Sequence, residues 1–298
     1  MKILLLGKDG QVGWELQRSL APLGELVALD RRDADLSQPD QLRETVLRLR
    51  PAVVVNAAAY TAVDKAESEP ELAHAVNALA PGVLAVAADE VGALMVHFST
   101  DYVFDGSGDT PRSETATTGP LSVYGQTKLE GEQRIQAACA RHLILRTSWV
   151  HAARGGNFAR TMLRLAKERE ELKVIDDQIG APTGADLIAD LTAHAIRQAV
   201  RDPACLGTCH LAAAGETSWH GYARFVLETA RELQPELTLR AREVLPIPTS
   251  AYPTAARRPL NSRLDTTRLR QTFGLSLPRW ETGVRRMLAE ILGPTGQK

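Results

Sequence analysis

The chain has 298 residues, of which 44% are hydrophobic and 24% are charged, so it can bury one large core or two domains that share a cleft. Its 35 basic residues nearly balance 36 acidic ones, and the net charge is -1. This balance excludes the strongly basic surface that bulk nucleic-acid or membrane binding requires, so we expect neither as a partner.

Three further features predict a cytoplasmic protein. The chain begins directly with the strand-like run Lys2–Leu6, without the charged start and cleavage site of a signal peptide. No apolar run approaches the roughly 20 residues of a membrane span. The cysteines, Cys139, Cys205 and Cys209, are odd in number, which argues against a disulfide framework. Because Cys205, Cys209 and the adjacent His210 lack a fourth ligand, we expect buried thiols and assign no metal site.

The first half of the chain alternates short apolar runs with helical segments. The runs expected to be buried parallel strands are Ile3–Leu6, Leu26–Leu29, Val53–Val55, Leu94–Phe98 and Leu143–Leu145. Helices are expected at Gln11–Leu20, at Gln41–Leu49 and at Glu71–Val91, where Pro81 predicts a kink or break. Strands that alternate with helices predict an α/β fold, a Rossmann-type doubly wound parallel sheet with helices on both faces.

The second half is dominated by helical segments and by connectors rich in proline and glycine. Helices are expected at Phe158–Glu170, Asp186–Val200, Ser218–Leu233 and Trp280–Leu292. We therefore predict a dinucleotide-binding domain at residues 1–150 and a smaller, mainly helical substrate lobe at residues 151–298. The lobe is expected to be partly discontinuous, with some segments returning to the Rossmann core, and to cover the carboxyl edge of the sheet, where such folds bind ligands.

A glycine-rich turn follows the first predicted strand and opens a helix. Glycines stand at Gly7, Gly10 and Gly13, with Gln11 and Val12 between the last two. Such a turn lets a pyrophosphate approach bare backbone, and the helix N-terminus adds free N–H groups and a partial positive charge. All five residues are therefore predicted to bind a dinucleotide.

The second predicted strand ends in a carboxylate, Asp30, about 20 residues beyond the glycines. An acid there accepts hydrogen bonds from the adenosine ribose and favours NADH. Arg31 and Arg32 follow it and Lys8 lies in the turn, and such cations can instead hold the 2′-phosphate of NADPH. Because these signals conflict, we expect both cofactors to be usable.

Two more segments are candidates for contact with the cofactor. Asp35 and Leu36 follow the second strand and are placed near the adenine. The third strand is followed by Asn56-Ala57-Ala58-Ala59-Tyr60, whose small residues let the backbone pass close to the dinucleotide. This run brings Ala58, Ala59 and Tyr60 into the predicted site.

A catalytic set is predicted from three residues. Tyr124 and Lys128 lie four positions apart, so they share one face of a helix. An ammonium group near a phenol lowers the tyrosine pKa toward the working pH and makes it a usable proton donor to a ketone oxygen. Thr100 ends a buried strand at the carboxyl edge, where its hydroxyl can orient the carbonyl oxygen beside Tyr124. Lys128 can also hold the nicotinamide ribose.

These motifs occur in an order that resembles the extended short-chain dehydrogenase/reductases and, more narrowly, the dTDP-4-dehydrorhamnose reductase family. The resemblance runs through both halves of the chain. The matching stretches are the glycine turn, Asn56–Ala59, Ser99–Phe104, Tyr124–Lys128, Arg146–Trp149, Asn157–Ala159, Asp177–Thr183 and Ala256–Ser262. One departure is Tyr60, where a histidine is common in the family.

The resemblance implies that the chain reduces the 4-keto group of dTDP-4-dehydro-L-rhamnose with NADPH or NADH. Tyr124 would protonate the developing alkoxide and Lys128 would tune it. Asp101 and Trp149 would lie along the sugar nucleotide, together with Thr100 and Tyr124. Cofactor contacts would include Thr61 beside Ala59 and Tyr60, and also Tyr124 and Lys128.

The resemblance has two further implications. Arg257 and Arg258 lie in a proline-bounded loop and can clamp the substrate pyrophosphate, and Arg257 is taken as the candidate. Some members of the family are magnesium-dependent dimers, so a homodimer is expected and Mg²⁺ is allowed but not assigned.

Two alternatives remain open at this stage. A sugar-nucleotide dehydratase or epimerase has the same fold, but dehydratases typically follow the threonine with an Asp-Glu pair, whereas Tyr102 stands here in place of the glutamate. A regulatory subunit similar to the beta subunit of methionine adenosyltransferase would need no catalytic set. The presence of the hydroxyl, phenol and ammonium groups together favours the reductase.

Overall fold

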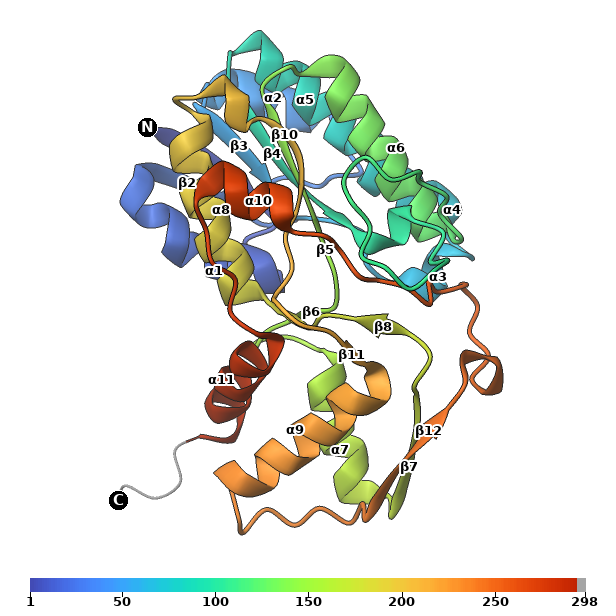
Figure 1. Ribbon diagram of the computed structural model, residues 1–298. Coiled ribbons are helices and arrows are strands. Elements are labelled where there is room, and N and C mark those ends of the chain that lie inside the picture. The colour runs from blue at the N-terminus through green and yellow to red at the C-terminus, as the bar shows by residue number, and fades with distance from the viewer. Residues whose placement is uncertain (294–298) are drawn as a thin grey trace.

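The computed structural model describes residues 1–293, and its centre is a six-stranded parallel sheet with the order β10-β5-β4-β3-β1-β2 (Figure 1). The strands are β1 (Lys2–Leu6), β2 (Glu25–Leu29), β3 (Val53–Asn56), β4 (Leu94–Thr100), β5 (His142–Thr147) and β10 (Gly207–His210). All five predicted strands are present and parallel, so the Rossmann-type doubly wound sheet is confirmed. Residues 294–298 of the predicted lobe lie outside the described part.

Helices cover both faces of this sheet. On one face α1 (Gln11–Leu20) packs against α8 (Ala185–Ala199), and on the other α5 (Ala80–Glu90) packs against α2 (Pro39–Leu49) and α6 (Val123–Ala138). Successive residues of β1 enter different cores, Ile3 and Leu5 on the α1 side and Leu4 and Leu6 on the α2 side. Because both faces are buried, the strands are continuous apolar runs.

The strand order reverses direction at β1. The chain passes from β1 to β2 on one side and then crosses to β3 on the other side of β1. In open α/β sheets the crevice at such a reversal, outside the carboxyl ends of the strands, is the usual ligand site. The glycine turn follows β1 and the alanine run follows β3, so the predicted cofactor residues lie at this position.

The sixth strand, β10, was not predicted. Its residues, Gly207-Thr208-Cys209-His210, lack an apolar run, yet Cys209 and His210 are completely buried beside β5. Burial raises the pKa of the Cys209 thiol to about 11. All three cysteines are free and buried, as expected, and no group of three or more metal-ligating side chains occurs among residues 1–293.

The predicted helix Glu71–Val91 contains a π-helical turn. Helix α4 (Pro70–His74) continues through the turn Ala75–Leu79 into α5, which carries Pro81 in its first turn. Pro81 has no N–H to donate to the carbonyl of Asn77, and Gly131 of α6 lies against that carbonyl, where a side chain would overlap it. The proline therefore shifts the hydrogen-bond pattern without ending the helix.

The same run, Pro70–Glu90, corrects the expectation that no segment has the length and hydropathy of a membrane span. By length and composition it is such a segment. Half of its most apolar window is buried inside the protein, and it packs against α2 and α6. Its apolar character is that of a helix in the core of the fold.

The lower part of Figure 1 is formed by α7 (Phe158–Glu168), α9 (Trp219–Leu233) and α11 (Trp280–Leu292) around a third hydrophobic core. Three pairs of short strands accompany them and were not predicted. The pairs are β7 (Glu171–Ile175) with β12 (Glu243–Ile247), β8 (Ile179–Gly180) with β11 (Thr217–Ser218), and β6 (Val150–His151) with β9 (Thr183–Gly184).

Segments from the second half of the chain also belong to the sheet layer. Helix α8, strand β10 and helix α10 (Thr267–Phe273) contribute side chains to the core beneath β1 and β3. Among them are Ile188, Cys209 and Phe273. The division into residues 1–150 and 151–298 stays a prediction.

Candidate active site

Two glycines of the phosphate-binding turn are required by packing and one is not. Gly7 has φ +83° and a Cβ there would lie 2.8 Å from the Ala58 nitrogen, whereas a Cβ on Gly13 would overlap the Gly7 carbonyl. At Gly10 φ is -70° and a Cβ would lie 3.4 Å from the Gly7 oxygen, which is an ordinary contact. The fold itself therefore explains Gly7 and Gly13 but leaves space beside Gly10.

The N-terminus of α1 opens beside Gly10. No side chain caps the helix, and its first turn carries no acidic residue. The first helical hydrogen bond is donated by Trp14 N to Gly10 O at 2.8 Å, so the N–H groups of Gln11, Val12 and Gly13 precede it. Free N–H groups and bare backbone together fit the pyrophosphate of a dinucleotide.

A loop from the second half of the chain lies against this turn, which the sequence did not reveal. The guanidinium carbon of Arg154 is 3.9 Å from the centre of the Trp14 ring. A Cβ on the neighbouring Gly155 would lie 3.4 Å from Cγ of Gln11. This loop brings an exposed cation to the first turn of α1.

Asp30 lies just beyond β2 among cations. Backbone N–H groups, first that of Arg32, lower its pKa, and Lys8 Nζ and the Arg32 guanidinium lie 3.5 and 3.3 Å from Oδ2. Arg31 is engaged elsewhere, with Asp35 at 3.3 Å. The acid and two of the cations that gave conflicting predictions of the cofactor thus form one ion-pair cluster, with Asp30 at its centre.

The remaining residues predicted to contact the cofactor lie outside the ion-pair cluster of Asp30. Leu36 is buried in the core beside α2, and Asp35 accepts hydrogen bonds from the backbone and hydroxyl of Ser37. Ala58 packs against Gly7, and Thr61 is exposed.

The loop after β3 is held by the π-helical turn. Tyr60 N donates to Asn77 Oδ1 at 2.9 Å, and Asn77 Nδ2 donates back to Tyr60 O at 3.0 Å. The Tyr60 hydroxyl donates to Glu69 at 2.7 Å. Asn77 therefore fixes the loop that is predicted to bind the cofactor. Asn77 was not among the residues predicted from the sequence, and the one feature that marks it is its position four residues before Pro81 in a helix.

Thr100 and Tyr124 come together as predicted. Thr100 is the last residue of β4, paired with Thr147 of β5, and Tyr124 is the second residue of α6, whose N-cap is Ser122. The Thr100 side chain lies close enough to the Tyr124 phenol to lower the pKa of that phenol. The ring of Tyr102 meets that of Tyr124 edge to face, with centroids 5.5 Å apart.

The pKa of Tyr124 differs from the expectation. Burial raises it to about 12, the Thr100 hydroxyl lowers it and Asp101 raises it, while Lys128 is not among the groups that act on it. The predicted lowering by Lys128 is therefore wrong for this arrangement. A phenol with a raised pKa keeps its proton at neutral pH, which is the form that a proton donor requires.

The position of Lys128 explains this difference. Its buried Nζ donates to the Phe98 carbonyl at 2.6 Å and lies 3.1 Å from Nε2 of His97, both on β4. Burial lowers the pKa of Lys128 to about 8, against the opposing effect of Glu132. The amine is directed at β4 and not at the phenol.

Asp101 adds a buried carboxyl group to the site. Thr100 Oγ1 donates to its Oδ1 at 3.0 Å, and the Ser262 side chain lies near enough to lower the pKa of the carboxyl group. Burial raises the pKa of Asp101 to about 6. Its Oδ2 is buried and has no hydrogen-bond partner among the described residues.

Trp149 lies just beyond the end of β5 in a strained backbone conformation, with φ +48°. Its ring stacks on that of Trp219 with centroids 3.6 Å apart, and Gly180 lies so close that a Cβ would be 2.8 Å from it. Trp219 Nε1 donates to Gln178 at 3.1 Å. Trp219 and Gln178 were missed, although Gln178 lies in a motif that the sequence singled out.

The proposed arginine clamp is only half available. Arg258 is paired with Asp64 at 2.7 Å, so its guanidinium is engaged within the protein, and its role as a clamp for a ligand stays a prediction. Arg257 is exposed and makes no hydrogen bond or ion pair with any residue in 1–293.

Comparison with known proteins decides the family. The family model described as the RmlD substrate binding domain matches residues 1–292. A dTDP-4-dehydrorhamnose reductase from Shigella flexneri is 59% identical, over 99% of this chain and 99% of the relative. The chain belongs to the dTDP-4-dehydrorhamnose reductase family. It is thus an oxidoreductase.

Solved structures of this family have the same fold. A dTDP-4-dehydrorhamnose reductase from Clostridium acetobutylicum superposes with a TM-score of 0.89 at 36% identity, covering 97% of this chain and 98% of the other. The reductase from Bacillus anthracis, solved in complex with NADP, has a TM-score of 0.88 at 34% identity, covering 97% and 99%.

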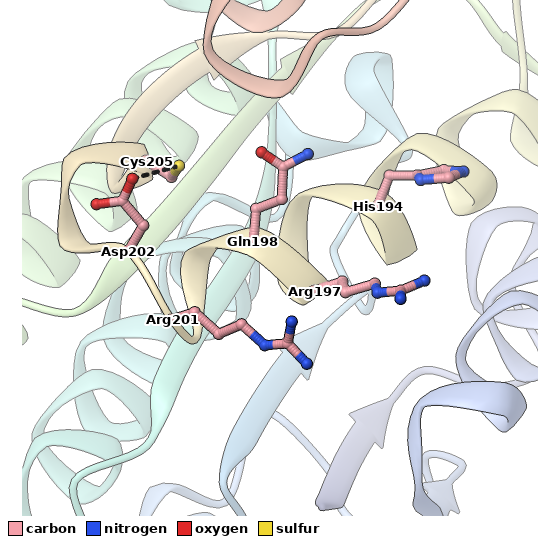
Figure 2. A pocket seen from close by; sticks show the side chains of 6 residues that line it. All are labelled: His194, Arg197, Gln198, Arg201, Asp202 and Cys205. Atoms are coloured by element: carbon pink, nitrogen blue, oxygen red, sulfur yellow. Dashed lines mark hydrogen bonds between the residues drawn. The ribbon is translucent and has the colours of Figure 1, made fainter.

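A hollow of about 400 Å³ lies elsewhere, along the C-terminal half of α8 and the turn after it (Figure 2). Its lining includes His194, Arg197, Arg201 and Asp202. None of the predicted site residues lines it.

Proposed function

We propose that this protein reduces the 4-keto group of dTDP-4-dehydro-β-L-rhamnose with NADPH or NADH, giving dTDP-β-L-rhamnose as the last step of dTDP-rhamnose biosynthesis. The observation that carries the assignment of the chemistry is the protonated Tyr124 phenol beside Thr100 at the carboxyl end of β4. The names of the relatives, and the NADP in one of them, support the substrate and the cofactor.

The residues fit a dinucleotide. The uncapped start of α1 and the space at Gly10 suit the pyrophosphate, and Asp30 with Lys8 and Arg32 suits the adenosine ribose in either phosphorylation state. When bound, the reduced nicotinamide supplies the hydride that adds to sugar carbon 4.

The chain's own residues then manage the proton. As carbon 4 is reduced, the carbonyl π electrons move to oxygen, and Tyr124 gives that oxygen its proton. In the substrate-free protein the Thr100 hydroxyl donates to Oδ1 of Asp101, which fixes it beside the phenol; to orient the reacting oxygen it must donate to that oxygen instead. The phenolate left on Tyr124 regains its proton from solvent, which completes the cycle.

The remaining candidates bind substrate. The stacked Trp149 and Trp219 offer an aromatic surface next to Gly180, and the free guanidinium of Arg257 suits the pyrophosphate of the sugar nucleotide. Elimination of water would need a second carboxylate after Asp101, where the chain has Tyr102, so plain reduction is favoured over a dehydratase.

The test is direct. Purified protein is mixed with the 4-keto sugar nucleotide and with NADPH or NADH, and the loss of nicotinamide absorbance and the product are followed. Formation of the rhamnosyl nucleotide is expected with both cofactors. Absence of turnover with either would refute the reductase, and binding of cofactor without turnover would favour a regulatory subunit.

We also place the enzyme in the cytoplasm as a homodimer. Three free, buried thiols are consistent with a reducing compartment. Light scattering with and without Mg²⁺ measures the mass in solution, and a monomeric mass under both conditions would exclude the dimer.

A further inference from the structure

A line of buried polar groups runs behind the catalytic residues. Asn56 ends β3, His97 lies in β4 and Lys128 projects from α6, and their exposed fractions are 1%, 1% and 2%. The predicted catalytic set includes Lys128, but neither Asn56 nor His97 has been given a part in the reaction. Buried polar groups are costly unless every donor meets an acceptor, so the positions of their protons can be worked out.

The backbone fixes the amide of Asn56. Ala58 N donates to Asn56 Oδ1 at 3.1 Å, so the oxygen must face that N–H group. The other end of the amide, Nδ2, is 3.2 Å from Nδ1 of His97 and donates to it. A neutral imidazole has one proton, and an accepting Nδ1 carries none, so the proton of His97 is on Nε2.

That proton is directed at the lysine. His97 Nε2 is 3.1 Å from Lys128 Nζ, and Nζ also donates to Phe98 O at 2.6 Å. A neutral amine has a lone pair to accept Nε2–H and hydrogens to donate to the carbonyl. An ammonium group has no lone pair, so an N–H of Lys128 and the Nε2–H of His97 would face each other as two donors without an acceptor.

We infer that His97, oriented by Asn56, is a positioning residue that favours the uncharged amine of Lys128 and so sets the upper pH limit of turnover. The part that concerns turnover rests on the proposed function. Lys128 is predicted to hold the nicotinamide ribose, and loss of its charge weakens that contact, so activity falls as pH rises through this limit.

Other charged groups around Lys128 do not reverse this effect. Glu132, one turn along α6, favours the ammonium form, but Arg146 of β5 holds it in an ion pair at 2.6 Å. Asp101 and Tyr124 make no hydrogen bond to Nζ within residues 1–293. Burial of His97 keeps its pKa well below the ordinary value, so the ring stays neutral.

The first experiment needs neither substrate nor variant. Nitrogen NMR of cofactor-free protein labelled with ¹⁵N-histidine reports which ring nitrogen carries the proton, and the His97 signals are assigned through its own side-chain carbons. We expect the neutral form protonated on Nε2 from about pH 6 to about pH 9. A proton on Nδ1, or on both nitrogens, would overturn the inference.

The second experiment reverses the direction of the hydrogen bonds between position 56, His97 and Lys128. In Asn56→Asp a carboxylate oxygen accepts from Nδ1–H, which leaves Nε2 free to accept from an ammonium group. The His97→Gln amide oxygen offers Lys128 the same acceptor without adding charge. In both variants the alkaline fall of kcat/KM is expected to move up by about one pH unit, equivalent to about one hydrogen bond.

Asn77→Asp is the control for the charge added at position 56, because Asn77 also holds the cofactor loop but does not touch His97. In Asn77→Asp the pH at which kcat/KM falls is expected to shift less than it does in Asn56→Asp. An unmoved fall in both His97→Gln and Asn56→Asp would overturn the inference. If the parent protein shows no turnover at all, the proposed function fails, while the NMR result still decides the position of the proton.

Discussion

The reacting end of the site and its adenosine end are built in different ways. Thr100, Asp101 and Lys128 are buried and hydrogen-bonded to neighbouring groups of the sheet. Asp30 and Arg32, by contrast, form an ion pair that reaches the surface, with the Asp30 side chain 11% exposed and that of Arg32 90% exposed. Exposed ion pairs contribute little and rearrange easily, whereas buried networks fix geometry. We therefore expect changes at the reacting end to affect turnover strongly and changes at the adenosine end to tune cofactor binding.

The largest effect is expected at Tyr124. Tyr124→Phe removes the only proposed proton donor, so kcat should fall about 10³-fold, in the range typical of general acids. Cofactor affinity, followed by fluorescence titration, should change less than about threefold, since the phosphate-binding turn is untouched. Tyr102→Phe is the matched control, because it removes the neighbouring phenol that contacts Tyr124 only through its ring edge. Equal losses in the two variants would mean that Tyr124 is not the proton donor.

Substitution of a glycine that packing requires should affect folding, whereas substitution of Gly10, which has space beside it, should affect cofactor binding. Gly13→Ala forces a methyl group into the Gly7 carbonyl and is expected to lower the free energy of unfolding by about 3 kcal/mol in urea. Gly10→Ala should leave unfolding nearly unchanged and weaken cofactor binding about tenfold, or about 1.4 kcal/mol. Unchanged cofactor affinity in Gly10→Ala would show that the space beside Gly10 is not used by the pyrophosphate.

Asp101 should reveal the stability cost of the reacting end. Its folded-state pKa of about 6 lies above the unfolded value, so the folded protein binds the proton more tightly. This contribution to stability is present at low pH and is lost as pH rises from about 4 to about 6. Asp101→Asn should therefore raise the free energy of unfolding by about 2 kcal/mol at neutral pH, but not near pH 4, while kcat falls. Equal stability of the two proteins at neutral pH would contradict the buried, costly carboxylate.

The sequence predicted the layers of the fold better than the details of the site. Apolar runs identified β1 to β5 because both faces of a parallel strand are buried, whereas β10 escaped because Gly207-Thr208-Cys209-His210 has no such run. The motif around Tyr124 and Lys128 identified the residues but not the direction of the lysine amine. That direction depends on His97, which comes from another strand, and no spacing along the chain encodes the contact.

At the adenosine end, Asp30→Ser should change cofactor preference with a smaller effect. Loss of the carboxylate leaves Arg32 without its ion-pair partner and Lys8 with Asp33 alone, so both cations can turn to a 2′-phosphate. The ratio of kcat/KM for NADPH over NADH should rise about tenfold, equivalent to about 1.4 kcal/mol. An unchanged ratio would place the adenosine ribose away from Asp30, and Asp30 would then not belong to the adenosine end of the site.

The smallest effect is expected at Arg154, which lies over Trp14 beside the start of α1. Its charge is exposed, so Arg154→Ala should weaken cofactor binding only about threefold at low salt and less at high salt, because ions screen surface charges. Arg164→Ala is the control, since Arg164 is an exposed arginine of α7 that pairs with Glu168. A salt-dependent loss in the first variant but not in the second would show that this loop supplies a cation to the cofactor phosphates. Equal affinities would confine the role of Arg154 to its contact with the Trp14 ring.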